Sequence, residues 1–377
     1  MKSTASKPDI VWTPLILFIA TAIVAIIGVP LWGYLHDFSA TAWITFSVLM
    51  IFGGISITGG YHRLWSHKAY DAHPILKVFF ALFGGMTLQN SILVWATGHR
   101  RHHRHVDDND KDPYSAGRGF WFSHMGWMIR HYPSGELDFS NGPDLQRDPI
   151  VMWQHRYYLA VAIGMNVGLP LAIGWLAGDM MGVFLLGSVL RLFLTHHFTF
   201  FINSLCHMWG SQPYSDQHSA KDNGLLALVT YGEGYHNFHH SFQNDYRNGL
   251  RWWQFDPTKW MIAACSWVGL ASRLNRCNAI KIQQARMLMQ FKKAKLVDKQ
   301  SHPNLAALVE AEYQQFLNTL STWRELKQKW VEDKKEELMA KWENTDIRTQ
   351  IKTLESTLKL QSKRLQLIIQ SPAFQTA

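Results

Sequence analysis

The feature that most constrains this chain is a set of four apolar runs, each long enough to cross a bilayer. They cover residues 12–35, 41–60, 157–177 and 183–206. A membrane-spanning helix needs about 20 predominantly apolar residues, because the hydrocarbon core is roughly 30 Å thick. Only short turns join the first run to the second and the third to the fourth. The sequence therefore predicts an all-α, multi-pass integral membrane protein with four transmembrane helices.

The distribution of basic residues predicts the orientation of these spans. The two short turns, residues 36–40 and 178–182, contain no Lys or Arg, whereas Lys2, Lys7 and the polar middle of the chain are basic. Cytoplasmic segments carry an excess of Lys and Arg, so we expect both termini and the polar middle in the cytoplasm. A further apolar stretch, residues 75–96, is interpreted as buried or interfacial, since another span would separate the polar segments.

Charge and cysteine content exclude other classes of protein. The formal net charge is +9, but the basic residues lie beside apolar spans and along a helical tail, and no nucleic-acid-binding motif is present. We therefore expect contact with a lipid bilayer and with anionic headgroups rather than with nucleic acid. The three cysteines form no Cys-x-x-Cys pair, which argues against a disulfide framework or a thiolate zinc site.

The composition changes near residue 275. Lys, Glu, Gln and Leu dominate residues 276–377, and apolar residues recur there at roughly helical spacing. The prediction is a membrane domain over residues 1–275 and a charged helical C-terminal extension of two or three helices over 276–377. The extension is read first as helices packed on themselves or on the body, and second as a docking or self-association arm.

Histidine is the residue type that indicates chemistry. Nineteen histidines are present, and most of those with regular spacing follow apolar runs. Two triplets have i, i+3, i+4 spacing, which places each triplet on one helix face. A pair five residues apart shares a face poorly on a regular helix, so we expect it at a helix end, with its members serving different metals. The clustered residues are His62 and His67, His99, His102 and His103, His236, His239 and His240, and Asn203 with His207.

Nine imidazoles from four segments exceed what one tetrahedral zinc needs and predict two metal ions with open positions. Imidazole binds Zn, Cu, Fe and Ni, and redox chemistry on oxygen favours iron or copper. Ligating imidazoles usually donate their second N–H to a carboxylate or carbonyl. Candidates for such supporting roles are His124 and Glu233, with Asp107, Asp108 and Asp110 as further acceptors. Arg191, inside an apolar span, is expected to be paired structurally or to lie near substrate.

These motifs resemble the membrane fatty acyl desaturase family, specifically its stearoyl-CoA (Δ9) desaturase-like branch. The resemblance covers roughly residues 12–275. It is carried by four segments: Thr58-Gly-Gly-Tyr-His-Arg-Leu-Trp-Ser-His67, His99-Arg-Arg-His-His103, Asn203-Ser-Leu-Cys-His207 and Gly232-Glu-Gly-Tyr-His-Asn-Phe-His-His240.

The resemblance implies four membrane helices under a cytoplasmic His-rich cap that holds two Fe ions. It implies that the nine clustered histidines are ligands, that Asn203 reaches a metal through water, and that no catalytic side chain is needed beyond this centre. It also implies a kinked substrate tunnel near Gln89, Asn90 and Trp95. The reaction implied is O2-dependent desaturation of a fatty acyl chain, giving a cis double bond at the Δ9 position.

The acyl carrier remains open. Acyl-CoA is the first expectation, but Thr97 and Gly98 precede the second histidine motif and Arg130 stands in a later segment, so the basic cluster that binds CoA in animal members is thinner here. An acyl-lipid or acyl carrier protein is the alternative. The chain has neither a Gly-x-Gly-x-x-Gly fingerprint after a strand nor a His-Pro-Gly-Gly haem motif. A separate electron donor, ferredoxin or cytochrome b5 with a reductase, is therefore implied.

Two rival functions use the same residues. A fatty acyl or alkyl hydroxylase of the same histidine-rich group would insert oxygen instead of removing a second hydrogen. A histidine-rich membrane metal transporter is the more remote alternative, because its ligands should line a pathway within the spans. Here most of the clustered histidines lie outside the apolar runs.

Overall fold

The computed structural model describes residues 8–295, 303–336 and 343–369. Contacts divide the chain into two compact units. The first comprises the chain up to Gln212 together with Gln217–Arg276, and the second comprises Pro213–Asp216 and the chain from Cys277 onward. Functional independence of a domain 1–275 and an extension 276–377 stays a prediction.

Among the residues that the structure describes, four helices are long and apolar enough to cross a membrane, which confirms the predicted number of spans. They are Trp12–Leu35, Ala40–Ser66, Tyr158–Ala177 and Met180–Met208. The second and fourth are longer than the predicted 41–60 and 183–206, because polar residues continue both helices beyond the apolar runs. In the first span 17% of the most apolar window is buried, against 50% in the fourth, so the fourth helix is central and the first is peripheral.

Each span is interrupted by π-helical turns. In chain order the segments are α1 (Trp12–Ile23), η1 (Val24–Gly28) and α2 (Val29–Leu35), then α3 (Ala40–Ile55) and η2 (Ser56–Ser66), then α8 (Tyr158–Ile163), η6 (Gly164–Gly168) and α9 (Leu169–Ala177), and finally α10 (Met180–Phe184), η7 (Leu185–Leu190), α11 (Arg191–Asn203) and α12 (Leu205–Met208). π-helical turns are rare and frequently mark functional sites.

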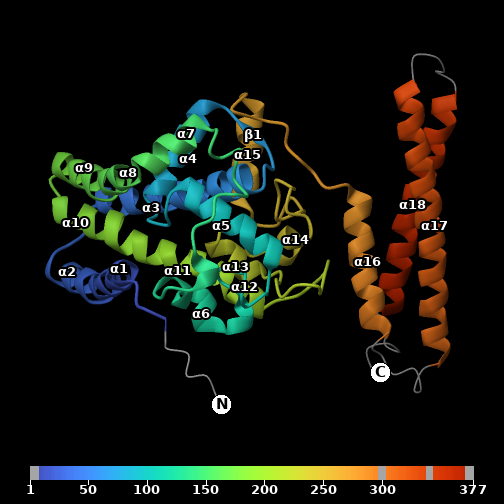
Figure 1. The fold of residues 1–377 in the computed structure, drawn as a ribbon, viewed down its shortest axis with the longest axis horizontal. Coiled ribbons are helices and arrows are strands. Elements are labelled where there is room, and N and C mark those ends of the chain that lie inside the picture. The colour runs from blue at the N-terminus through green and yellow to red at the C-terminus, as the bar shows by residue number, and fades with distance from the viewer. Residues whose placement is uncertain (1–7, 296–302, 337–342, 370–377) are drawn as a thin grey trace. The chain divides into compact units, whose positions relative to one another are not determined.

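The two hairpin turns contact each other at one end of the bundle. Ser39 caps α3 by accepting a hydrogen bond from the Ala42 amide, and Asp179 caps α10 through the Gly182 amide. The Ser39 amide also donates to Asp179 Oδ2 at 3.2 Å. Gly178 ends α9 with φ of 71°, a left-handed conformation that favours glycine. These caps place both turns at the end of the spans opposite α5 and α14 (Figure 1).

The remaining elements of the first unit form a cap. Its helices are α4 (Pro74–Gly85), α5 (Ile92–His105), η3 (Ala116–Arg118), α6 (Phe120–His124), η4 (Gly126–Met128), η5 (Pro133–Gly135), α7 (Pro149–Arg156), α13 (Gly224–Val229), α14 (His236–Ser241) and α15 (Pro257–Trp267). Strands β1 (Asp71–Ala72) and β2 (Ala271–Ser272) pair antiparallel, with Asp71 opposite Ser272. The apolar stretch 75–96 is thus divided between α4 and α5, and the 12 residues of α4 are too few to span a bilayer.

A buried core joins the second span to this cap. Tyr61, Trp65, Phe80, Ile92 and Ile262 belong to one cluster and are each less than 5% exposed. Gly60 allows the close approach, because a Cβ there would lie 2.6 Å from the Phe80 Cβ. Packing of α4, α5 and α15 against η2 positions the end of the second span relative to the histidine-bearing helices.

The second unit contains α16 (Ala279–Lys295), α17 (Pro303–Glu336) and α18 (Glu343–Ile369), in line with two or three helices. Their apolar faces form a separate core that includes Phe291, Phe316, Leu320 and Leu358. Ile347, Ile351, Leu358 and Leu365 are buried in that core at roughly heptad spacing. The helices of the extension therefore pack on one another.

Candidate metal centre

The structure brings all nine clustered histidines into two neighbouring groups. The first contains His62, His67, His99, His103 and His239, and the second contains His102, His207, His236 and His240. Within each group the potential ligand nitrogens all lie within 4.8 Å of one another. The side chains come from η2 and the residue after it, from α5, from α12 and from α14. Segments almost 180 residues apart in the chain therefore converge on one site.

His62 and His67 lie in the same group, which corrects the expectation that they serve different metals. Residues Ser56–Ser66 form a π-helix, and the His67 amide donates to the His62 carbonyl at 3.1 Å. A π-helix closes i→i+5 hydrogen bonds, so residues five apart share a face. The two rings are 4.8 Å apart. A spacing of five residues does not share a face on a regular α-helix, but it does on a π-helix.

Helices α5 and α14 each supply both groups. On α5, His99 and His103 belong to the first group and His102 to the second. On α14 the division is reversed, because His239 belongs to the first group while His236 and His240 belong to the second. Two ions bound by these groups would be neighbours held by the same two helices.

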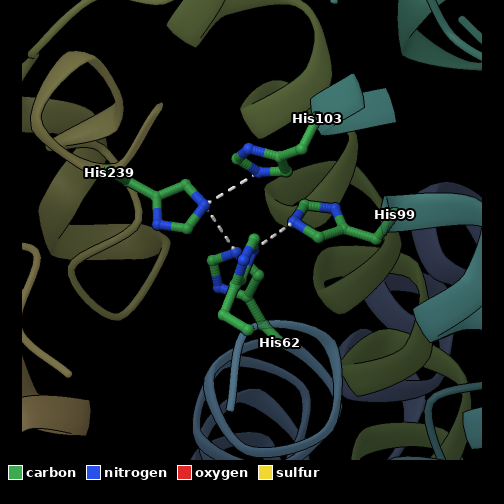
Figure 2. A group of neighbouring side chains, drawn as sticks. His62, His99, His103 and His239 are labelled. Carbon is green, nitrogen blue, oxygen red and sulfur yellow. Dashed lines mark hydrogen bonds between the residues drawn. The ribbon is translucent and has the colours of Figure 1, made fainter. Parts of the chain in front are cut away.

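The Nε2 atoms approach each other directly. In the first group the separations are 2.9 Å for His62–His239, 2.9 Å for His67–His99 and 3.0 Å for His103–His239. Figure 2 shows the rings of His62, His99, His103 and His239 pointing toward a common space. In the second group Nε2 of His236 lies 3.1 Å from Nε2 of both His207 and His240.

Hydrogen bonds at the Nδ1 atoms explain why the Nε2 atoms of the same rings suit a cation. Nδ1 of His62 lies 2.9 Å from Glu233, Nδ1 of His102 lies 2.9 Å from Asp112, and Nδ1 of His207 lies 2.7 Å from the Ser219 hydroxyl. A proton held at Nδ1 by a carboxylate leaves a lone pair on Nε2. Converging lone pairs repel unless a cation lies between them. Separations near 3 Å are those expected of imidazoles about 2.1 Å from a shared ion. The donor set therefore fits metal ions.

Burial keeps these imidazoles neutral. Desolvation, followed by the neighbouring histidines, lowers the pKa of His99, His103, His239 and His240 well below the usual value. The same causes lower the pKa of His236. Neutral imidazole is the form that ligates metals, so the site is ready for a metal at neutral pH.

Glu233 has the supporting position expected of it. Its Oε2 contacts His62 Nδ1, and its Oε1 accepts from Arg63 at 2.9 Å. Arg63 also contacts Asp256 at 3.0 Å, and Asn248 donates to Glu233 Oε2 at 2.7 Å. Burial opposes ionisation, but His62 and Arg63 outweigh it and lower the pKa of Glu233. The buried Glu233 carboxylate thus orients the His62 imidazole, and the Arg63 guanidinium keeps that carboxylate ionised.

The remaining supporting groups were only partly anticipated. Asp112 contacts His102, and the Tyr114 hydroxyl lies 3.1 Å from His99 Nδ1, although neither residue stands out by its spacing. Asp107, a named candidate, contacts Ser219 and lies 4.0 Å from His207 Nδ1. Asp108 instead accepts from the amides of Asp110 and Lys111 in a local turn. Only the fold selects among these neighbouring acidic residues.

Of the three residues predicted near a tunnel, Trp95 adjoins the first group. Trp95 stacks on His99 with ring centroids 4.9 Å apart, and its indole N–H donates to Gln89 Oε1 at 3.3 Å. Gln89 Nε2 donates to the Thr199 hydroxyl at 3.0 Å. The Asn90 amide donates to the Tyr158 hydroxyl at 3.0 Å. Gln89 and Trp95 therefore link His99 to the fourth span.

Two other predicted residues lie less directly at the site. His124 contacts the Ser204 hydroxyl at 3.1 Å and His197 Nδ1 at 3.0 Å rather than a clustered imidazole. Its influence on the site is therefore indirect, through the helix break at Ser204. Asn203 ends α11 four residues before His207, and its role as a ligand through water stays a prediction.

Comparisons with known proteins agree with this geometry. A family model described as fatty acid desaturase matches residues 37–271. The chain is 42% identical over 291 residues to "Probable acyl-CoA desaturase" of Schizosaccharomyces pombe, covering 76% of this chain and 60% of that protein. It is 40% identical to "Acyl-CoA desaturase 1" of Saccharomyces cerevisiae, over 72% of this chain and 56% of the relative.

A cyanobacterial relative is matched over nearly its full length. The "sn-2 palmitoyl-lipid 9-desaturase" of a Nostoc species is 36% identical over 274 residues, 71% of this chain and 92% of that protein. By contrast, the matched region spans little more than half the length of the two yeast proteins. Three of the four candidate spans and both histidine groups fall within the matched family region, and the first span precedes it. The chain belongs to the fatty acid desaturase family.

Proposed function

We propose that this protein is an O2-dependent fatty acyl desaturase that forms a cis double bond at the Δ9 position, with acyl-CoA as substrate. The observation that carries the proposal is the convergence of nine imidazoles, seven of them buried, in two adjoining groups. Relatives named acyl-CoA desaturases and a 9-desaturase support the substrate class and the position.

The two histidine groups would each hold one iron ion. The first ion would be held by His62, His67, His99, His103 and His239, and the second by His102, His207, His236 and His240, with Asn203 through water. When bound, a di-iron centre supplies with O2 an oxidant that can break an unactivated aliphatic C–H bond, which protein side chains cannot do. Two hydrogens would leave adjacent carbons, and these two hydrogens, two donated electrons, two protons and O2 would together give two waters.

The chain's own residues orient the centre and the substrate. Glu233, Asp112 and Ser219 hold the Nδ1 sides of three ligands and so direct their Nε2 atoms inward. Trp95, stacked on His99, would pack against the acyl chain beside the centre, and Gln89 and Asn90 would shape the bend. Holding two chosen carbons against the oxidant is the protein's main contribution to rate and position.

An acyl-lipid is the second candidate substrate, because the relative matched over 92% of its length is named an acyl-lipid desaturase. The basic residues beside α5 are partly engaged within the cap. Arg100 forms a bidentate pair with Asp144, and Arg130 donates to the Pro8 carbonyl. Arg104 is exposed and would remain for a CoA phosphate, whereas the exposed Lys111 lies 3.6 Å from Asp108.

We further propose that the cap and both termini are cytoplasmic, as the basic residues predict. A separate donor, ferredoxin or cytochrome b5 with its reductase, would supply the electrons. Its acidic surface would be steered by the net charge of +9. The helical extension, residues 276–377, would serve a secondary role outside the reaction.

The test is expression in a desaturase-deficient host, with His103→Ala as the matched variant. Double bonds are then located by mass spectrometry, and iron is measured in the purified membrane protein. We expect cis-Δ9 products from the intact chain and none from the variant. Hydroxylated products would assign the sister reaction instead, and metal uptake into vesicles without any lipid product would favour transport.

A further inference from the structure

Arg191 is a buried cation in the middle of the membrane bundle. It lies eleven residues into the fourth span, Met180–Met208, about 16 Å from its start at roughly 1.5 Å per residue. Its exposure is 0%. No carboxylate lies within ion-pair distance of it in the part of the chain that the structure describes. Burying such a charge is costly, so its contacts should serve a purpose.

Those contacts converge on the end of α4. Arg191 donates to the Met86 carbonyl at 3.3 Å, to the Gly187 carbonyl at 3.0 Å and to Asn166 Oδ1. Asn166 Nδ2 donates to the same Met86 carbonyl at 2.8 Å. His196 Nε2 lies 2.8 Å from the next carbonyl, that of Thr87. The last carbonyls of a helix lack intrahelical partners and carry partial negative charge, so a guanidinium is well suited to cap them.

The turn after this capped end is strained. Leu88 and Asn90 have φ of 53° and 74°, values that residues other than glycine adopt at a cost. Such conformations persist only where the surroundings hold them. On one side the turn is held by the side chains of Arg191, Asn166 and His196. On the other side it is held by the Tyr158 hydroxyl, which accepts a hydrogen bond from the Asn90 amide.

Gln89 lies between Leu88 and Asn90, and its side chain connects the turn to the candidate metal centre. The Gln89 side chain accepts a hydrogen bond from Trp95, which stacks on His99. It also donates a hydrogen bond to Thr199 of α11, the helix that begins at Arg191. Arg191 is thus connected to Trp95 through its hydrogen bond to Met86, the backbone of residues 86–89 and the Gln89 side chain. The π-helical segments η6 and η7 lie at the same place: Asn166 is within η6, and Arg191 directly follows η7.

We propose that Arg191, with Asn166, is a positioning residue that holds the Met86–Asn90 turn and thereby determines where along the acyl chain the double bond is placed. The claim about the double bond rests on the proposed desaturase function. The claim about the turn does not, because it concerns backbone stability alone. Arg191 touches neither histidine group, so its loss should leave metal binding intact.

The experiment compares the full-length protein with Arg191→Met and Asn166→Leu by hydrogen–deuterium exchange in detergent. Arg191→Lys retains the positive charge but loses the forked guanidinium that reaches two acceptors. Its exchange at the turn is expected to lie between that of the wild type and that of Arg191→Met. Ser47→Ala is the matched control, since the Ser47 hydroxyl bonds only to the Trp43 carbonyl in its own helix. Exchange of amides 87–90 should rise about tenfold in Arg191→Met, as expected for losing a hydrogen bond from a charged donor. Exchange over α5 and iron per chain should not change.

Products of the same variants test the second claim. We expect Arg191→Met to give a mixture of double-bond positions where the wild type gives one, and Ser47→Ala to match the wild type. Unchanged exchange at the turn would overturn the positioning role. Faster exchange with an unshifted double bond would overturn the link to position. A wild type that makes no unsaturated product would refute the proposed function, while the exchange result would still decide the role of Arg191 in the turn.

Discussion

At the residue scale, Glu233 decides whether His62 presents its lone pair to the first histidine group. Glu233 and Arg63 are 2% and 1% exposed, so neither charge is stabilised by water. Each is stabilised by the other, by Asp256 and by the imidazole. Removing one partner of a buried pair is strongly destabilising, because the other charge remains buried. The network therefore joins metal affinity to stability.

Replacement of Glu233 by Gln should weaken both properties. We expect metal affinity to fall about 10–100-fold and the free energy of unfolding to fall by about 3 kcal/mol, because Arg63 and His62 lose their shared anion. Iron per chain across a chelator series and thermal unfolding in detergent would measure these effects. Asp108→Asn, in a local turn, is the control. Unchanged iron retention in Glu233→Gln would contradict the supporting role.

At the element scale, α7 depends on a single carboxylate at its start. Asp148 accepts from the amides of Ile150 and Val151 and pairs with Lys77 of α4 at 2.8 Å. The cap satisfies amides that would otherwise lack partners, and the ion pair joins α7 to α4. Burial opposes the charged form, but Lys77 and the two amides outweigh it and lower the pKa of Asp148.

A lowered folded pKa predicts the pH dependence of this contribution. The charged carboxylate stabilises the fold above the unfolded pKa of about 4, and this stabilisation is lost as pH falls through the lower folded value. Asp148→Asn should therefore differ most from the wild type at neutral pH and converge with it in acid. Asp148→Ala should cost about 1 kcal/mol more through loss of the cap. Unfolding at pH 7 and pH 3 would measure this, and a difference that grows in acid would contradict it.

At the scale of the whole molecule, the reaction machinery lies within one of the two compact units. Every clustered histidine and every supporting residue lies in the unit that ends at Arg276. The second unit has its own apolar core around Phe316 and Leu358. The first unit has a core of its own around Tyr61 and Phe80.

Truncation after Arg276 should therefore preserve the site. We expect the shortened chain to insert in membranes, retain the iron content of the full chain and form the same lipid product. Iron analysis and product analysis on purified full-length and truncated protein would measure this. A folded, membrane-inserted truncation without iron would assign the extension a role in assembling the centre.

The sequence by itself determined the spans, the cap helices that carry histidine and the histidines that gather in the two groups. These depend on local properties: apolar length against bilayer thickness, and i, i+3, i+4 spacing on α5 and α14. The number of imidazoles predicted two metal ions, and the resemblance of the four motifs to known desaturases added iron as the metal and the nine histidines as its ligands. Arg191 could be identified as unusual from its position in an apolar run, but its partners could not.

The tertiary structure alone decided which side chains contact one another. The π-helix of Ser56–Ser66 aligns His62 with His67, because packing against α4, α5 and α15 stabilises a turn that local propensity disfavours. The choice of Asp112 over Asp108 as a partner for His102 depends on how the chain turns after α5. The choice of Met86 and Asn166 as partners for Arg191 depends on contacts between distant segments. Spacing along the chain carries no information about such contacts, since a hydrogen bond depends on where the fold places its two atoms.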